Sequence, residues 1–247
     1  MIVYDSELKI FYSDKINSAR YFSGFATREL GDARNTEVIT RFLKEEETPS
    51  RRIVTLEQIH SANVSHYVTN DEAHAENIEE TDGVVTKESN VALTVLTADC
   101  TPIVYVDKEA EVIGISHQGW RGLLKKLPQK LIESMEKEGA RRDHLVASLG
   151  PAIGDCCYDI SEDRYAEFAS EYEEYVGQIF RERKGKWYLN LSLLSYLLLV
   201  EGGVQKENID FFPFCTSCDK KRFFSARRAK TPKSERQFSF IIKNEKK

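Results

Sequence analysis

Three residues with the chemistry of metal ligands, His60, Cys100 and His117, each follow an apolar, strand-like run of the sequence. Two imidazoles and one thiolate form a ligand set that suits zinc. Three protein ligands with one open position are typical of a catalytic zinc, whereas a structural zinc normally has four. A water molecule at the open position would be activated. Because the three positions are far apart in the sequence, this prediction depends on a fold that gathers them.

The same residues support other kinds of chemistry. Cys100 with His117 or His60 as its base would make a cysteine hydrolase or amidase. A copper-dependent polyphenol oxidase needs several coppers and many histidines, but the chain has only five, and we expect His66 and His74 to lie on a solvated surface. A non-catalytic metal-binding protein is the remaining alternative.

The stretch that delivers His117 is the clearest local signal. Residues 112–116 are short, β-branched and apolar, which predicts a buried strand. Gly119 and Gly122 favour a tight turn, and an amphipathic segment from Leu123 to Met135 predicts the following helix. Backbone N–H groups at a helix start can receive an anion, and Arg121 would flank its approach.

Two further strands are predicted to carry the other candidate ligands. Alternation over residues 53–60 predicts a strand with Gln58 and His60 on the same face, so both side chains are expected to face one cleft. The apolar segments 91–97 and 103–106 are separated by a break at Pro102. This break would expose Asp99, a candidate acid or base, together with Cys100.

The remaining pattern predicts an ordinary mixture of elements. A hairpin is expected near residues 4–12, an acidic loop near 71–80, and strands over 84–86 and 145–149. Helices are expected over about 35–47, after a Ser161 cap, and over about 191–201.

Composition excludes several classes of protein. The 247 residues are 41% hydrophobic and carry a net charge of −5, which argues against nucleic-acid binding through bulk electrostatics. No secretory signal is visible at the N-terminus, and the longest apolar run, over residues 193–200, is too short to span a bilayer. The sequence therefore predicts a cytoplasmic protein with no membrane partner, whose five cysteines are reduced.

The other cysteines and the basic C-terminal region are weaker signals. Vicinal Cys156 and Cys157 are interpreted as packing residues. Cys215 and Cys218 form a lone Cys-x-x-Cys, for which a zinc knuckle or redox pair is the minority interpretation because no second pair follows closely. Farther on, Phe223, Phe224, Arg227 and Arg228 combine aromatic rings with guanidinium groups, which could stack a base and bind phosphate. An ordinary basic edge strand is the alternative interpretation.

Several blocks occur in an order that is specific in combination. The chain resembles the laccase-domain family of purine nucleoside phosphorylases, first labelled multicopper polyphenol oxidases, in Glu57-Gln58-Ile59-His60, Thr81-Asp82-Gly83, Thr97-Ala98-Asp99-Cys100-Thr101-Pro102, His117-Gln118-Gly119-Trp120-Arg121-Gly122, Leu149-Gly150-Pro151-Ala152-Ile153-Gly154 and Phe223-Phe224-Ser225-Ala226-Arg227-Arg228. The resemblance implies a zinc-dependent enzyme, with copper as the other candidate metal, that phosphorolyses adenosine, inosine and methylthioadenosine. It also implies adenosine deamination, and it matches His60, Cys100 and His117 to the metal ligands.

The resemblance also implies a mixed α and β fold (α+β), with mixed sheets flanked by helices in a single domain over residues 1–247. The expected partners are a purine nucleoside and phosphate. The predicted substrate contacts are Gln58, Arg121, Phe224 and Arg227. Two departures from the family pattern affect the pocket wall and the N-terminal contacts: Gln118 replaces the usual alanine, and residues 28–35 match only loosely.

Overall fold

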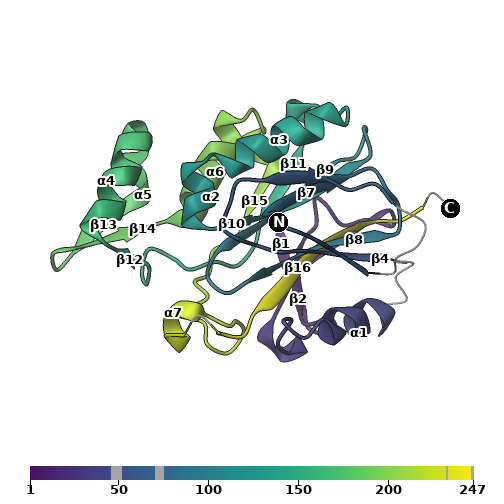
Figure 1. The fold of residues 1–247 in the computed structure, drawn as a ribbon, viewed down its shortest axis with the longest axis horizontal. Helices are drawn as coiled ribbons and strands as arrows, with labels where there is room; N and C mark the ends of the chain where they lie inside the picture. The colour runs from purple at the N-terminus through teal and green to yellow at the C-terminus, as the bar shows by residue number, and fades with distance from the viewer. Residues whose placement is uncertain (46–51, 70–74, 232, 246–247) are drawn as a thin grey trace.

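The structure, a computed structural model, describes residues 1–45, 52–69, 75–231 and 233–245. Its mixed sheets and surrounding helices confirm the predicted α+β class. In these ranges, two large sheets lie at the centre and a small three-stranded sheet lies to one side of them (Figure 1).

The first large sheet, within the described residues, has seven strands in the order β1-β2-β3-β16-β8-β4-β6. β4 pairs in parallel with β6 and β8, and the other pairings are antiparallel. The strands are β1 (Ile2–Asp5), β2 (Ile10–Ser13), β3 (Tyr21–Ala26), β4 (Arg52–Leu56), β6 (Ala75–Ile78), β8 (Val91–Thr97) and β16 (Gln237–Lys243). Consequently the C-terminal strand β16 lies in the middle of this sheet, between β3 and β8.

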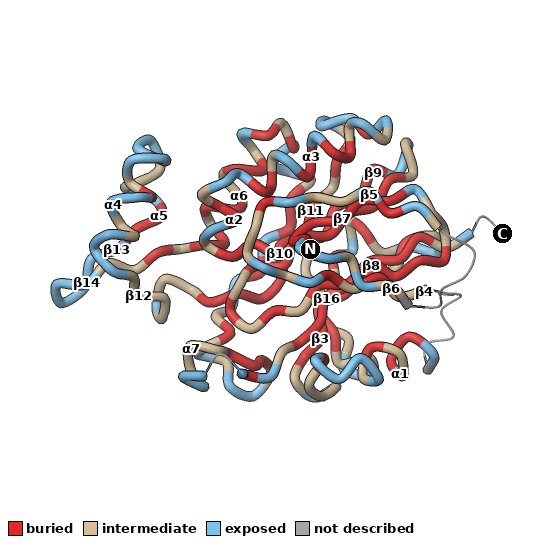
Figure 2. Tube along the Cα trace, viewed as in Figure 1, coloured by how far each residue is buried: buried red, intermediate tan, exposed pale blue. Residues whose placement is uncertain are grey.

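The second large sheet, again counted over the described residues, has six strands in the order β15-β11-β9-β10-β7-β5. Its strands are β5 (Val64–His66), β7 (Gly83–Thr86), β9 (Thr101–Asp107), β10 (Val112–Gln118), β11 (Val146–Leu149) and β15 (Ile209–Phe211). Every residue of β9 and β10 is buried, because both faces of the sheet are covered (Figure 2). This explains the continuous apolar runs that predicted these strands.

Three apolar clusters hold the layers together. The two sheets pack on each other through side chains such as Leu93 and Ile113. The outer face of the first sheet is covered by α1 (Glu37–Glu45), whose Phe42 ring packs edge-on against Phe238 and Phe240. The outer face of the second sheet is covered by α3 (Leu127–Lys137) and α6 (Leu191–Glu201).

The small sheet carries the remaining helices (Figure 1). It is formed by β12 (Asp159–Ile160), β14 (Lys186–Leu189) and β13 (Phe180–Arg183). α4 (Glu162–Glu171) and α5 (Val176–Ile179) pack beside it, and α2 (Trp120–Leu124) joins the same apolar cluster. The predicted Ser161 cap of α4 is confirmed, since its Oγ accepts a hydrogen bond from the Arg164 N–H. In the described part of the chain, the last helix is α7 (Ala226–Ala229).

Two predicted elements were wrong in their extent. The helix expected from Leu123 to Met135 is divided into α2 and α3, because Lys126 adopts a left-handed conformation with φ 57° and Pro128 lies in the first turn of α3. Proline cannot continue a helix from the preceding turn because it lacks an N–H. The strand expected over residues 53–60 ends at Leu56, and the chain then turns away from the sheet.

The predicted acidic loop was also partly wrong. Residues 75–78 of that loop form β6, which pairs with β4 at an outer edge of the first sheet. Edge strands tolerate polar residues, so the sequence lacked an apolar signal there. His66 lies on β5 at the protein surface, where its Nδ1 is 2.9 Å from Glu138 Oε1. His74, residues 71–73 and the predicted end of the first helix at 46–47 lie outside the described residues. Across the described chain, no helix combines the length and the apolar character needed to cross a bilayer.

Candidate metal centre and substrate cavity

The three predicted metal ligands come together from two connections and one strand end of the two large sheets. His60 lies in the loop between β4 and β5, Cys100 lies in the turn between β8 and β9, and His117 is the penultimate residue of β10. The ligand atoms of all three lie within 4.8 Å of one another. The prediction that the fold gathers them is therefore supported by the geometry.

The local geometry suits a tetrahedral metal with one open position. Cys100 Sγ lies 3.8 Å from His60 Nε2, and the two imidazole centroids are 4.8 Å apart with their planes at 78°. Sulfur and nitrogen atoms that share a zinc ion at about 2.3 and 2.0–2.1 Å are separated by distances of this size. We conclude that the residues present fit a soft divalent metal held by two nitrogens and one sulfur.

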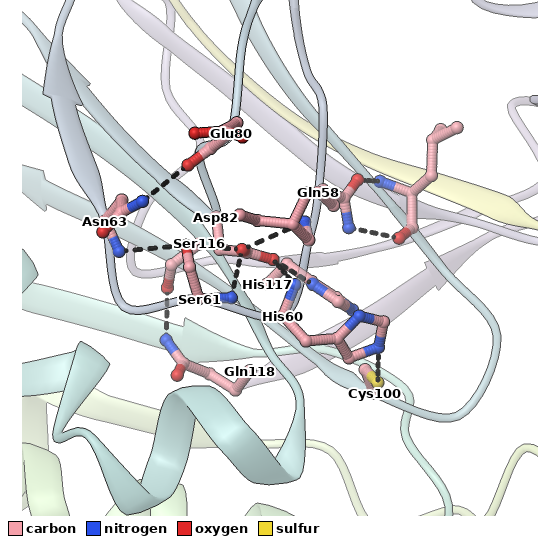
Figure 3. A network of polar contacts seen from close by, with 12 residues as sticks. Gln58, His60, Ser61, Asn63, Glu80, Asp82, Cys100, Ser116, His117 and Gln118 are labelled. Atoms are coloured by element: carbon pink, nitrogen blue, oxygen red, sulfur yellow. Dashed lines mark hydrogen bonds and ion pairs between the residues drawn. The ribbon is translucent and has the colours of Figure 1, made fainter.

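Asp82 orients this ligand set from behind (Figure 3). Its fully buried carboxylate lies with Oδ1 2.8 Å from His117 Nδ1. The carboxylate also accepts hydrogen bonds from Ser61 Oγ and from three backbone N–H groups, those of Ile59, His60 and Ser61. Because an ionised carboxylate only accepts, His117 is a donor at Nδ1, and its Nε2 is left for a metal. One side chain thus fixes both histidines.

The electrostatics of the ligands are strongly coupled. Burial raises the pKa of the Cys100 thiol, but the neighbouring His117 and His60 rings outweigh burial and lower it to about 6. Burial lowers the pKa of His117, and the Cys100 thiolate and Asp82 raise it to about 9. Burial likewise raises the pKa of Asp82, while its bonds to His117 and Ser61 give a net lowering. The thiolate form needed for metal binding or nucleophilic attack is therefore favoured.

Gly119 gives the ligands room. A Cβ at this position would lie 2.5 Å from His60 Cδ2 and 3.5 Å from Cys100 Sγ. The sequence had indicated that a glycine here lets the backbone approach a ligand, and the structure shows that it lets the backbone approach the ligating side chains themselves.

We expect Gly119→Ala to displace His60 and weaken metal binding by about 10- to 100-fold, the effect usually seen when ligand positioning is disturbed. The matched control is Gly177→Ala, because a Cβ there meets no atom within 4 Å. Metal affinity, measured by competition with a chromophoric chelator, should be unchanged in the control. Equal affinities in both variants would show that the close contact at Gly119 does not position His60.

Asp99 does not have the arrangement expected of an acid or base. Its backbone has a positive φ of 96°, and its carboxylate is buried. Oδ1 accepts a hydrogen bond from Thr216 Oγ1 at 2.7 Å, while Oδ2 accepts from Ser225 Oγ at 3.0 Å and from the Arg227 N–H at 2.7 Å. The carboxylate is thereby committed to holding the start of α7 in place.

Asp99→Asn is therefore expected to cost stability, about 1.5–3 kcal/mol, because an amide N–H₂ cannot accept the bonds at Oδ2. Chemical denaturation measures this loss, and Thr216→Val, which removes one donor from Oδ1, should cost about 1 kcal/mol. A variant with wild-type stability and no turnover would instead restore Asp99 as a proton carrier.

A cavity of about 480 Å³ opens beside the ligand atoms, a volume in the range of small-molecule sites. Apolar and aromatic side chains and three cationic ones contribute to its wall. The lining residues are His60, Leu96, Ala98, Asp99, Cys100, His117, Tyr158, Ala226, Arg227, Lys230, Thr231, Ser234 and Arg236. A cavity with this lining can hold a partly apolar ligand that carries negative charge.

Of the predicted substrate contacts, Arg227 reaches this cavity. Its guanidinium lies 5.0 Å from the centre of the Tyr158 ring and forms an ion pair with Asp159. NH1 also donates to the Cys157 carbonyl at 3.1 Å. This arrangement holds a cation and an aromatic face side by side at the cavity wall.

The structure does not bring the other three predicted contacts to the cavity. Both ends of the Gln58 amide bond the backbone of Leu96, at 2.7 and 2.8 Å, so this side chain continues the sheet where β4 has ended. The Arg121 guanidinium lies 4.4 Å from the centre of the Trp120 ring. The Arg28 guanidinium lies 4.8 Å from the centre of the buried Phe224 ring. None of the three is among the lining residues.

Sequence reasoning missed Asp82, Tyr158 and Lys230. Thr81-Asp82-Gly83 was identified as a family-like block with no role assigned to Asp82. A metal-bound histidine normally has a carboxylate partner, and this could have prompted a search for one. Tyr158 directly follows the vicinal cysteines, and nothing in its local pattern distinguished it from a packing residue. The interpretation of Cys156 and Cys157 as packing residues was wrong for Cys156, which is exposed with its sulfur 3.5 Å from Cys218 Sγ.

Comparison with known proteins identifies a family that matches most of this chain. A family described as multi-copper polyphenol oxidoreductase laccase matches residues 22–244. A protein named adenosine deaminase RL5, from an unknown prokaryotic organism, is 33% identical over 61% of this chain and 58% of its own length. The purine nucleoside phosphorylase YlmD of Bacillus subtilis is 31% identical over 65% of this chain, again 58% of its own length.

The chain thus spans somewhat more than half the length of these two curated relatives in the alignments. The match to a solved structure is more extensive. The crystal structure of YlmD from Geobacillus stearothermophilus has a TM-score of 0.85 and 26% identity, and the match covers 99% of both chains.

Proposed function

The chain belongs to the multi-copper polyphenol oxidoreductase laccase family, and we propose that it acts as a zinc-dependent purine nucleoside phosphorylase. The relatives named purine nucleoside phosphorylase and adenosine deaminase indicate an enzyme of this broad kind. The observation that carries the proposal is the position of the ligand atoms of His60, Cys100 and His117 on the wall of a cavity that also presents Arg227 and Tyr158. Metal ligands, cations and an aromatic face are what phosphate and a nucleoside require together.

In the proposed reaction, a phosphate oxygen attacks the anomeric carbon of the ribose and the bond to the purine nitrogen breaks. The bonding electrons leave with the base, which takes up a proton, and the products are the free purine and ribose 1-phosphate. Zinc held by His60, Cys100 and His117 would supply a Lewis acid that binds and orients the attacking phosphate.

The other cavity residues have roles that follow from their chemistry. Arg227, Lys230 and Arg236 attract the phosphate anion and hold it by charge-assisted hydrogen bonds. The Tyr158 ring offers a face on which a purine can stack. Leu96, Ala98 and Ala226 provide an apolar wall suited to the methylthio group of methylthioadenosine, while inosine and adenosine share the same ribose and ring system.

Adenosine deamination belongs to the same proposal. If water rather than phosphate is the nucleophile and attacks the purine carbon that bears the amino group, ammonia leaves and inosine forms. The proposed setting is the cytoplasm, where thiols such as Cys100 stay reduced.

The direct test is product chromatography of adenosine incubated with zinc-loaded protein, with and without phosphate. Adenine that forms only when phosphate is present supports phosphorolysis, and inosine in either tube supports deamination. Arg41→Ala is a suitable control, because Arg41 lines a separate surface hollow. Adenosine that remains intact under both conditions, with inosine and methylthioadenosine equally untouched, would remove the nucleoside proposal.

A cysteine hydrolase is the second candidate, favoured by the 3.8 Å separation of Cys100 Sγ and His60 Nε2 and by the lowered pKa of the thiol. Trapping of an acyl-enzyme on Cys100 in metal-free protein would support it. Copper oxidation ranks lower, because in the described part of the chain only one cluster of metal-binding side chains includes histidine. His66 and His144 lie instead beside Glu138 and Glu109.

A further inference from the structure

A second cluster of potential metal ligands lies outside the cavity, where two pairs of cysteines from distant parts of the chain meet. Cys156 and Cys157 lie in the connection between β11 and β12, and Cys215 and Cys218 follow β15. The four sulfur atoms all lie within 4.8 Å of one another. The Cys-x-x-Cys that lacked a partner pair in the sequence therefore has one in the fold.

The spacing of the sulfurs suits a single metal ion. Four thiolates at about 2.3 Å from a zinc ion lie roughly 3.8 Å apart at the corners of a tetrahedron. Cys218 Sγ lies 3.5 Å from Cys156 Sγ and 3.4 Å from Cys157 Sγ, and all the cysteines are free. A disulfide, with a bond of about 2.05 Å, would use only one of these two contacts.

The backbone around the cluster is held in place without any metal. A parallel bridge joins Ala152 and Cys215, and the Thr216 N–H donates to the Ala152 carbonyl at 3.0 Å. Gly154 leaves space for the sulfurs, since a Cβ there would lie 3.2 Å from Cys156 Sγ and 3.3 Å from Cys215 Cβ. Two segments that are far apart in the sequence are therefore preorganised to present their thiols to one point.

Consecutive arginines tie both cysteine segments to α7. Arg227 NH1 donates to the Cys157 carbonyl, and Arg228 NH1 donates to the carbonyls of Thr216 and Ser217 at 2.8 and 3.0 Å. These arginines also bring positive charge near a cluster that would be anionic with four thiolates bound to a divalent ion.

We propose that Cys156, Cys157, Cys215 and Cys218 form a structural zinc site. Four sulfur ligands in a tetrahedron select zinc or iron, and a site with four protein ligands has no open position for catalysis. The ion would link the segment that carries Tyr158 to the segment that leads into α7, and so would hold one wall of the cavity in place. The proposal does not depend on the nucleoside reaction.

The experiment uses the His117→Ala protein, in which the cavity site has lost a ligand and the cysteine cluster is intact. Expressed with zinc and purified under reducing conditions, this protein is expected to retain one tightly bound zinc, measured by elemental mass spectrometry. The double variant His117→Ala with Cys218→Ser should retain none. The matched control adds Ser217→Ala instead, which changes the neighbouring side chain and should keep the zinc.

Cobalt substitution reports the ligands directly and works without the cysteine variants, even if these fail to fold. Wild-type chain loaded with cobalt is expected to show the intense thiolate-to-cobalt charge-transfer and visible bands of a tetrahedral four-sulfur site. A spectrum with only one thiolate ligand, a His117→Ala protein that binds no zinc, or a tightly bound iron in place of zinc would overturn the proposal. A disulfide within the cluster, detected by intact mass in protein purified under reducing conditions, would overturn it as well.

Discussion

His117→Ala is expected to empty the cavity metal site and to reduce adenosine phosphorolysis by on the order of 10³-fold, because Lewis-acid stabilisation contributes several kcal/mol and each 1.4 kcal/mol is about tenfold. His117 is almost fully buried, 3% exposed, and the neighbouring imidazole, that of His60, is already one of the three candidate ligands. Initial rates of purine release and zinc content measure the two effects.

The matched control for this variant is His66→Ala. His66 is half-exposed on β5 and pairs with Glu138, away from the cavity lining. We expect it to keep wild-type zinc content and rate. If His117→Ala kept both as well, the ligand assignment would be wrong.

Asp82→Asn is expected to lower metal affinity and activity by about 10- to 100-fold while leaving all three ligands present. Asparagine keeps only one acceptor oxygen. Either the Oδ1 position, which accepts from His117 Nδ1 and the His60 N–H, or the Oδ2 position, which accepts from Ser61, therefore loses its acceptor. Since hydrogen bonds to a charged group contribute about 1.5–3 kcal/mol, the free energy of unfolding should fall by a similar amount. Zinc competition measures the metal affinity, turnover measures the activity, and chemical denaturation measures the free energy of unfolding.

A second buried aspartate separates orientation from stability. Asp107 is also fully buried and accepts backbone hydrogen bonds from Glu109, Ala110 and Arg141. Asp107→Asn should therefore lose comparable stability with unchanged metal affinity. If both variants lost metal equally, general destabilisation would explain the result and the orienting role of Asp82 would fall.

The candidate ligands were predictable because each is a rare residue type directly after an apolar run. Such runs become central strands, and the ends of central strands meet at a common edge. The types of His60, Cys100 and His117 then indicate the metal. The path between strand and ligand was not predictable, because the chain leaves β4 at Leu56 and His60 itself adopts a left-handed conformation with φ 59°.

Roles that depend on contacts distant in sequence were the ones missed. Alternation placed Gln58 toward the cleft, but the strand had ended and its amide bonds Leu96 instead. Asp82 was recognised only as part of a family-like block, and its bond to His117, 35 residues away, exists only in the folded protein. The two cysteine pairs likewise lacked any local sign of each other, since a bridge between Ala152 and Cys215 is what brings them together.

Metal removal and restoration tests the central claim most directly. Adenine formation from adenosine and phosphate would be measured on the purified wild-type chain, after exhaustive chelation, and after zinc is returned. We predict that chelation abolishes adenine formation and that zinc restores it in the wild-type chain but not in His117→Ala. A chelated protein that is shown to be free of metal and still forms adenine at the original rate would contradict a metal-dependent nucleoside phosphorylase.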